Sequence, residues 1–300
     1  MPPIPPPRAD GFTTSTAVPL YWAEYGEPDA PPLLLLHGGP GASHEYLLPQ
    51  MLELASDHRL VCYDQRGGGR SRRDDDRVPI GWRDQVADVA AIVRELRLTP
   101  LTIVGYSWGA LLAMLYAIEA TAGRVAPLPA RLALLSPAPV TRAWREEFEA
   151  EFARRQSGPA ILALRDELLR SGLRESDPDA YRQRAFELSV AGYFADPRRA
   201  RDLTPFRITG RVQQSIWSSL GDFDLLPALA GLDLPAVVLH GRQDPIPLAS
   251  SEAAARALDA PCVVLDDCGH VPYVEQPVHL FSVLQDFLRE ALSPALPRSA

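Results

Sequence analysis

The chain has 300 residues, of which 46% are hydrophobic and 23% are charged, and this length allows one large α/β domain or a domain with a sizeable insertion. Its formal net charge of −8 has the wrong sign for a surface that binds phosphates, so we expect no nucleic-acid partner. No run approaches the roughly 18 apolar residues of a membrane span, so we expect no membrane partner either. A small molecule or a short peptide is the expected partner.

The cysteines and the N-terminus favour a cytoplasmic protein. Cys62, Cys262 and Cys268 are odd in number and lack metal-ligand spacing, so we expect neither a disulfide framework nor a metal site. Residues 1–12 lack the cationic start and apolar core of a signal peptide, and their prolines predict an extended, partly ordered tail. The chain contains no Lys and no Asn, which excludes Schiff-base lysines and N-glycosylation. We expect no cofactor.

Short apolar runs alternate with segments of helical period, which predicts a mostly parallel sheet with helices on both faces. The expected elements of the first half, in chain order, are an antiparallel strand at 19–26, strands at 33–36 and 59–63, a helix at 81–97, a strand at 101–105, a helix at 108–120 and a strand within 130–139.

The character of the sequence changes at about residue 141. The following segment is rich in Arg and Glu, has helical period and shows no convincing strand, so we expect a helical cap at 141–220. It divides the core into a first part, 1–140, and a second part, 221–300. Strand patterns resume at 236–240 and 262–265, and a helix at about 276–291 closes the chain.

A Gly-x-Ser-x-Gly motif stands between the strand at 101–105 and the helix that follows it. A sharp strand-to-helix turn exposes the central hydroxyl, and the flanking glycines let neighbouring chain approach closely. Five-residue matches of this kind also occur by chance, but the strand and helix on either side supply the context that the motif requires. Ser107 is therefore the expected nucleophile.

A serine hydroxyl needs a base to take its proton. Among the six histidines, His270 lies just past the last expected strand, where the functional groups of an open α/β sheet gather. His279 falls in a helical pattern, His58 precedes a strand and His44 lies in a loop, so we expect surface or packing roles for these three. His270 is the expected base.

A third group must orient the base, and an acid after the preceding strand has the right place in the chain order Ser, acid, His. Asp244 follows the strand at 236–240 and is our prediction. Asp266 and Asp267 compete with it, but they lie so close to His270 in the chain that a turn would also explain them.

Two backbone N–H groups are expected to bind a developing oxyanion, one from Trp108, which follows the nucleophile, and one from Gly39 in "HGGPG". A simple Gly/Pro turn is the alternative for that loop, and His37 is expected to be a structural hydrogen-bonding residue. In "YDQRGGGRS", residues 63–71, no phosphate-loop frame is present, so we interpret Asp64 and Arg66 as a structural ion pair.

Taken together, "HGGPG", "DQRGGGRS", "GYSWGALLA", "GRQDP" and "GH" resemble the α/β-hydrolase fold and, within it, the proline iminopeptidase (prolyl aminopeptidase) family. The resemblance covers roughly residues 17–140 and 221–292. It implies Ser107, Asp244 and His270 as the catalytic residues, Gly39 and Trp108 as the oxyanion hole, and release of an N-terminal residue, typically proline, from small peptides.

The cap departs from this resemblance. Peptide-cleaving members hold the substrate's α-amino group with cap glutamates, since a buried ammonium needs a carboxylate partner. Glu187, which has apolar neighbours, is our candidate for the acid that binds this amino group. The alternative is that Glu187 is an ordinary acid on the solvent-facing side of a helix. Glu146 and Glu147 fit a solvated face, and Gln213 and Gln214 stand where an acid was sought. The aromatic residues expected to line an apolar pocket, or else to pack the cap, are Trp144, Tyr193, Phe194 and Trp217.

Three functions follow from these patterns. The first is a serine aminopeptidase of the prolyl type, and the second is a serine esterase or amidase acting on a small apolar acyl substrate without a free amine. The third is a catalytically silent hydrolase-fold protein, against which the complete set of Ser107, Asp244 and His270 argues.

Overall fold

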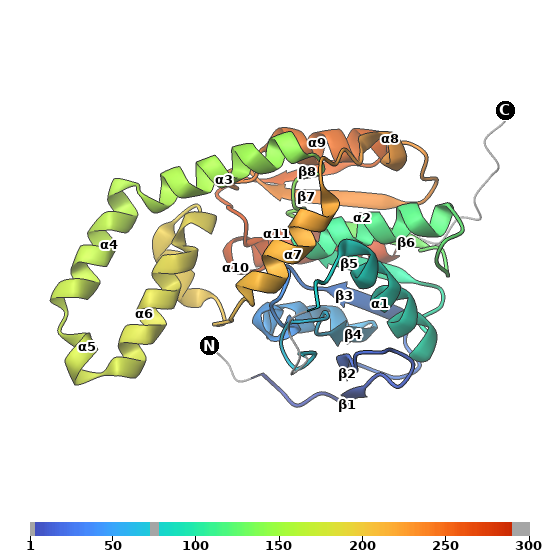
Figure 1. Ribbon diagram of the computed structural model, residues 1–300, viewed down its shortest axis with the longest axis horizontal. Helices are drawn as coiled ribbons and strands as arrows, with labels where there is room; N and C mark the ends of the chain where they lie inside the picture. Colours follow the sequence, from blue (N-terminus) through green and yellow to red (C-terminus); the bar gives the residue numbers. More distant parts are fainter. Residues whose placement is uncertain (1–3, 73–77, 290–300) are drawn as a thin grey trace.

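The computed structural model describes residues 4–72 and 78–289. Within this part of the chain an eight-stranded sheet forms the centre, in the order β1-β2-β4-β3-β5-β6-β7-β8 (Figure 1). The strands are β1 (Ala9–Phe12), β2 (Tyr21–Tyr25), β3 (Pro32–Leu36), β4 (Arg59–Tyr63), β5 (Thr102–Tyr106), β6 (Arg131–Leu135), β7 (Ala236–Gly241) and β8 (Cys262–Leu265). The strands expected from the apolar runs are all present.

Six strands, from β4 to β8 in the sheet order, run parallel, and β1 and β2 add an antiparallel edge. The carboxyl ends of the parallel strands therefore meet at one edge of the sheet, where α/β proteins build their sites. β1 corrects the expected N-terminal tail, because residues 9–12 pair with β2, while residues 1–3 lie outside the described residues.

Helices cover both faces of the sheet (Figure 1). Apolar side chains of one face pack against α1 (Trp82–Glu95), α2 (Trp108–Thr121), α8 (Leu226–Leu229) and α9 (Leu248–Ala257). The other face packs against η1 (His44–Leu47), η2 (Gln50–Ser56), α10 (Pro272–Glu275) and α11 (Pro277–Arg289). The last expected helix ends at Arg289, and the final two of its predicted residues lie outside the described part.

Between β6 and β7 the chain leaves the sheet and forms helices that reach out as an arm (Figure 1). These elements are α3 (Arg142–Gln156), α4 (Pro159–Arg170), α5 (Leu173–Ser176), α6 (Pro178–Val190), η3 (Ala191–Tyr193), η4 (Pro197–Asp202) and α7 (Gly210–Leu220). We call residues 141–220 the cap. Its helical content matches the expectation, and the division into a core and a cap stays a prediction.

The buried runs explain why the sheet forms where it does. Leu33 to Leu36 and the middle of β6 are fully buried, as parallel strands covered on both faces must be. Helix α2 is apolar on nearly every side because it lies between the sheet and α1. Among the described residues no helix is both long and apolar enough to cross a membrane.

Candidate active site

Ser107 lies in a strained turn between β5 and α2. Its backbone has φ 54° and ψ −117°, a conformation that a residue with a side chain rarely adopts. The end of β6 and the loop after it fix the turn: the backbone N–H of Ser107 donates to the carbonyl of Leu135 at 2.9 Å, and the carbonyl of Ser107 accepts from Ala138 N–H at 3.0 Å. The turn thus holds the serine side chain out at the carboxyl edge of the sheet.

The two glycines of the motif are required by close contacts of backbone with backbone. A Cβ on Gly109 would lie 2.1 Å from the carbonyl oxygen of Leu36, and one on Gly105 would lie 2.5 Å from the carbonyl oxygen of Gly109. Neither neighbour is a side chain that can move aside. The glycines therefore let β5 and α2 pack tightly enough for the turn to form.

The structure joins Ser107 to His270 and Asp244 by hydrogen bonds. Ser107 Oγ lies 2.9 Å from His270 Nε2, and Nδ1 of the same ring lies 2.8 Å from Asp244 Oδ2. Asp244 follows β7 and His270 follows β8, as expected. Of the competing acids, Asp266 pairs with Arg242, and Asp267 occupies a turn with φ 50°.

Asp244 is held in its ionised form. Burial opposes ionisation, but the charges of His270 and His240 and hydrogen bonds from His270 and from Ile246 N–H outweigh it, so the pKa of Asp244 lies below its usual value. Burial lowers the pKa of His240, whose ring spans between Ser251 and the carbonyl of Ile246. The acid thus keeps a full negative charge next to His270.

His270 is clamped by rings and backbone. The ring lies between Tyr106, at a centroid distance of 5.3 Å, and Tyr193, at 5.1 Å. The backbone N–H of His270 donates to the carbonyl of Tyr193 at 2.6 Å, and the backbone carbonyl of His270 accepts from the hydroxyl of Tyr106 at 3.0 Å. Because Tyr193 belongs to η3 of the cap, one half of this clamp comes from outside the sheet.

Gln65 connects its own loop with the loop of His37 and with the first residue of α2, beside Ser107, and we did not single it out from the sequence. Its side chain donates to the carbonyl of His37 at 2.6 Å and accepts from Trp108 Nε1 at 2.9 Å, while its N–H donates to His37 Nε2 at 3.1 Å. Burial lowers the pKa of His37 to about 4, so its ring is neutral and can accept this bond. His37 has the structural role that we expected.

Gly39 and Trp108 both line the space around Ser107. Trp108 is the first residue of α2, where an N–H has no acceptor within its own helix. Gly39 has φ 134°, and its carbonyl accepts from the Gln213 side chain at 2.8 Å. The glutamine that stands where an acid was sought therefore ties α7 to the "HGGPG" loop.

The ion pair expected between Asp64 and Arg66 is wrong. Asp64 Oδ1 lies 2.7 Å from His44 Nδ1, and the same carboxylate accepts from the N–H groups of His44 and Arg70. Arg66 binds Asp88 on α1 instead, with its Nε 2.9 Å from Oδ2. Both side chains do fix loops, but each uses a partner far away in sequence. His44 is buried, which agrees with the packing role, one of the two roles that we expected for it.

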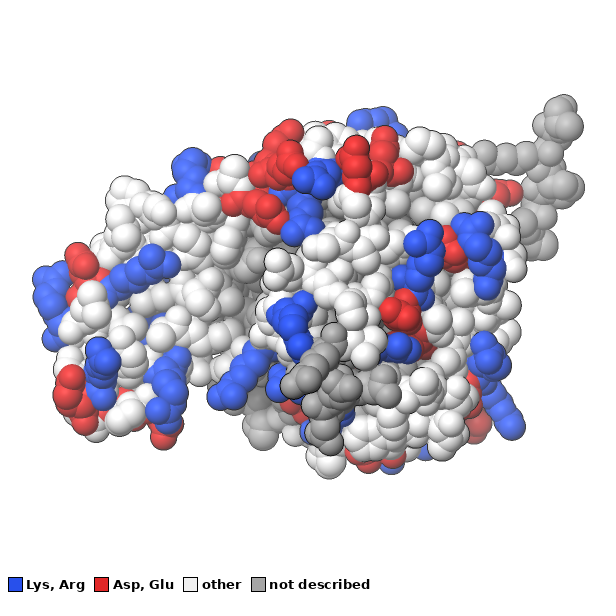
Figure 2. Space-filling view, in the orientation of Figure 1, with Lys and Arg blue, Asp and Glu red and all other residues white. Residues whose placement is uncertain are grey.

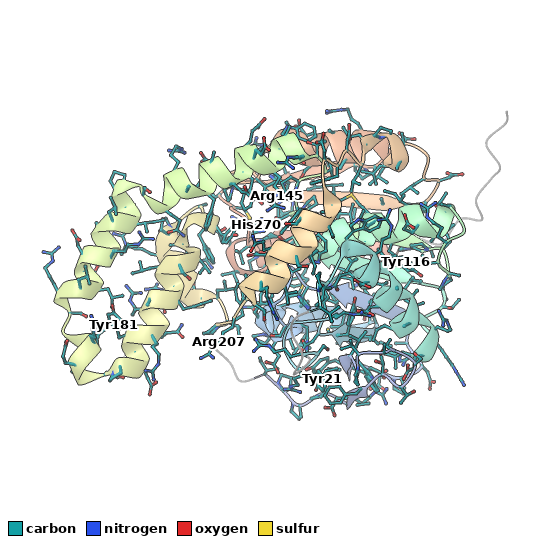
Figure 3. All side chains as sticks on the ribbon, in the orientation of Figure 1. Tyr21, Tyr116, Arg145, Tyr181, Arg207 and His270 are labelled. Carbon is teal, nitrogen blue, oxygen red and sulfur yellow. The ribbon has the colours of Figure 1, made fainter. Side chains whose placement is uncertain are left out.

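A pocket of about 360 Å³ opens over Ser107 and His270. One wall comes from the core, through Trp108 and Ile246, and the other comes from the cap. The cap residues that line it are Arg145, Phe148, Glu149, Phe152, Tyr193, Gly210, Gln213, Gln214 and Trp217. Figure 3 shows His270 below α3 and beside α7, close to Arg145 of the cap.

The structure brings some of the predicted cap residues to this pocket and not others. Tyr193 and Trp217 line it, whereas Trp144 packs against one core cluster and Phe194 is buried in the other. Glu187 does not reach Ser107. Its carboxylate pairs with Arg184 and accepts from Gln183 within the cap, beside a separate pocket of about 210 Å³.

Glu149 is the cap carboxylate that lines the pocket with Ser107, and we did not predict it from the sequence. The sequence feature that could have indicated Glu149 is the helical spacing of a set of residues on one side of α3, namely Arg145, Phe148, Glu149 and Phe152. Figure 2 shows acidic and basic side chains mixed over α3, so charge alone does not distinguish Glu149 from its neighbours. Only the position of α3 beside the pocket does so.

The geometry suits nucleophilic chemistry: a hydroxyl bonded to an imidazole that a carboxylate orients is the arrangement that activates serine. The family model of the alpha/beta hydrolase fold matches residues 31–277, and the chain belongs to this family.

Within the family the chain is similar to proline iminopeptidases. The enzyme of Lactobacillus delbrueckii subsp. lactis is 27% identical over 285 residues, covering 87% of this chain and 90% of that protein. The one of Lactobacillus helveticus is 25% identical over 281 residues, covering 89% and 93%. The crystal structure of a proline iminopeptidase-related protein from Thermus thermophilus matches with a TM-score of 0.71 at 25% identity, covering 96% of this chain and 99% of that one.

Proposed function

We propose that this chain is a serine aminopeptidase of the proline iminopeptidase type, which releases an N-terminal apolar residue such as proline from short peptides. One observation carries the proposal: Ser107 and His270, whose ring is bonded to Asp244, line the same pocket as a cap carboxylate, Glu149. The similarity to the Lactobacillus proline iminopeptidases supports it. We also propose a cytoplasmic location, because the three cysteines are odd in number and lack metal-ligand spacing, which fits a reducing compartment.

The proposed reaction has two steps. Ser107 Oγ attacks the scissile carbonyl carbon while His270 Nε2 takes the hydroxyl proton, and Asp244 stabilises the imidazolium. The N–H groups of Gly39 and Trp108 bind the oxyanion. The C–N bond then breaks as His270 returns the proton to the leaving amine. Water, deprotonated by His270, hydrolyses the acyl-enzyme and frees both the amino acid and Ser107.

Glu149 is the proposed partner of the substrate's α-ammonium group. Its two contacts with Arg145 both use Oε1, at 2.8 Å from Nε and 2.7 Å from Nη2. Oε2 is therefore the oxygen that we assign to the ammonium. The aromatic rings of Phe148, Phe152 and Tyr193, which contact one another, supply apolar surface for the side chain of the released residue.

A second candidate is a serine esterase or amidase whose substrate lacks a free amine. The observation in its favour is the Arg145–Glu149 pair itself, since the guanidinium neutralises the carboxylate that an ammonium would need. The two functions differ in what blocking the amine does to turnover.

The test compares proline p-nitroanilide with N-acetylproline p-nitroanilide and with p-nitrophenyl butyrate. We expect kcat/KM to be about 10- to 100-fold higher for the anilide with a free amine than for the blocked anilide, because a hydrogen bond to a charged group contributes about this much to binding. Glu149→Gln should reduce this ratio, and Glu146→Gln, on the same helix but paired with Arg142, should keep it. Preference for the blocked anilide or for the ester would favour the second candidate.

Ser107→Ala tests the chemistry common to both candidates. Turnover should fall by at least about a thousandfold with folding intact, because removing a nucleophile of this kind costs several powers of ten. Circular dichroism provides the control for folding. A variant that keeps more than about 1% of the rate would show that Ser107 is not the nucleophile.

A further inference from the structure

Arg145 is a fixed cation inside the pocket. Its guanidinium lies over the ring of Trp217, with Cζ 4.0 Å from the ring centroid, and Glu149 holds one edge through Nε and Nη2. The side chain is 26% exposed, so most of it is enclosed by the protein. Stacking and pairing together fix the plane of the guanidinium before any ligand arrives.

The other edge of this guanidinium is open to a ligand. An arginine has five N–H donors, and Glu149 engages only the Nε side. Within residues 4–72 and 78–289, no protein acceptor bonds to Nη1 of Arg145. A planar donor edge of this kind, held in a pocket with a serine, matches the geometry of a carboxylate.

We propose that Arg145 binds the C-terminal carboxylate of the substrate, so that the preferred substrates are dipeptides with a free amine and a free carboxyl end. This inference rests on the proposed function, because it places the substrate's ammonium on Glu149 and its scissile bond at Ser107. The pocket then presents one negative and one positive group to the two charged ends of a single small molecule.

The spacing of the two protein charges fits a dipeptide. The amine and the carboxylate of a dipeptide are carried by Cα atoms about 3.8 Å apart. Arg145 Nη2 lies 2.7 Å from Glu149 Oε1, so the two protein charges stand side by side, as the two ends of a dipeptide require. Each further residue would move the carboxylate about 3.3–3.6 Å beyond Arg145.

Little stability is lost when the Arg145–Glu149 ion pair also binds a substrate. Glu149 is 54% exposed, and an ion pair so open to water contributes weakly to stability. The same two residues also border an outer pocket of about 310 Å³ with Gln214 and Trp217, so the pair stands at the boundary between the serine pocket and the surrounding solvent. A charged peptide end can therefore reach it without crossing an apolar barrier.

The experiment measures kcat/KM for prolyl-glycine and for prolyl-glycinamide, which differ only in the terminal carboxylate. We expect the free acid to be preferred by about tenfold or more, because a bidentate charged contact is lost in the amide. Arg145→Met should bring the ratio to about 1. Arg145→Lys, which keeps the charge but not the planar edge, should give an intermediate ratio and guards against a folding defect in the Met variant.

Arg142→Met is the matched control, since Arg142 forms the equivalent pair with Glu146 but lines only the outer pocket. It should retain the wild-type ratio. A wild-type ratio near 1, or a preference that survives in Arg145→Met, would overturn this inference and leave the aminopeptidase intact. If neither peptide is cleaved while p-nitrophenyl butyrate is, the proposed function fails and the inference falls with it.

Discussion

Glu275 is a buried carboxylate that joins the loop of His270 to the cap. Oε2 accepts from Gly269 N–H at 2.7 Å, and Oε1 accepts from Ala195 N–H at 2.9 Å. Gly269 adjoins His270, and Ala195 follows η3, so one side chain spans two segments that approach from opposite sides. Replacing Glu275 by Gln keeps the shape and removes the charge.

Burial raises the pKa of Glu275 from 4.5 to about 7, although the amide hydrogen bonds and Arg199 act in the opposite direction. A pKa that is raised by folding means that the folded protein binds the proton more tightly than the unfolded chain. The stabilisation is fully present below about pH 4.5 and is lost as the pH rises through about 7. Since one pKa unit corresponds to about 1.36 kcal/mol, ionisation of Glu275 withdraws about 2.5 kcal/mol of unfolding free energy between pH 5 and 8.

The assay is urea unfolding of the wild type and of Glu275→Gln at pH 5, 6, 7 and 8. The unfolding free energy of the wild type should fall, relative to that of the variant, by about 2.5 kcal/mol across this range. Other titrating groups, such as Asp88, whose pKa burial raises to about 6, occur in both proteins and cancel in the difference.

Glu147→Gln on the exposed face of α3 is the control and should follow the wild-type profile. Parallel profiles for the wild type and Glu275→Gln would refute the reasoning, because a carboxylate that titrates alike in both states is not enclosed between the loop and the cap.

Two further predictions concern the framework of the site. Asp64→Ala should lower the unfolding free energy, measured by urea denaturation, by about 3–5 kcal/mol, because it leaves the buried His44 without its partner. A loss below about 1 kcal/mol would contradict the assignment of a buried pair. Gly109→Ala should prevent stable folding, because the new Cβ would lie 2.1 Å from the carbonyl oxygen of Leu36. Gly210→Ala places its Cβ with nothing within 4 Å, so it should raise the unfolding free energy by about 0.4–1 kcal/mol. Equal melting temperatures for the two variants would refute this contrast.

The sheet could be predicted from the sequence because its strands are apolar on both faces. The run at 33–36 is all leucine, and such a run between turn residues has few alternatives to a buried strand. β1 was missed for the opposite reason. Residues 9–12 are half exposed and follow a run of prolines, and they form a strand only because β2 offers a free edge. Local composition carries no information about such an edge.

The core part of the site was also predictable, because each strand delivers one residue to the same edge of the sheet. Ser107, Asp244 and His270 could be chosen by their positions after strands, together with the Gly-x-Ser-x-Gly motif and the chain order Ser, acid, His. The partner of Asp64 could not be chosen in this way. An ion pair within one loop looked sufficient, but the buried carboxylate instead meets His44 from another loop, and that contact exists only in the folded chain.

The cap illustrates the limit of sequence periodicity. Glu187 has apolar neighbours along α6, which correctly indicate burial, and it is buried. Periodicity does not say which way a buried face points, and this one faces the interior of the cap. Glu149 looked like one more acid on a charged helix, yet its side of α3 lines the pocket with Ser107. The placement of the cap helices in the folded chain decided between the two acids.

The cap therefore contributes to more than the choice of substrate. The carbonyl of Tyr193 accepts from His270 N–H, and Gly269 approaches so closely that a Cβ there would lie 2.2 Å from the same carbonyl. Glu275 adds a second connection through Ala195. Under the proposed mechanism, a cap displaced to admit a substrate would release the backbone of the general base. Substitutions at the 193–195 segment should then lower kcat. Substitutions at Arg145, which contacts Trp217 and Glu149, should act mainly on selectivity between substrates.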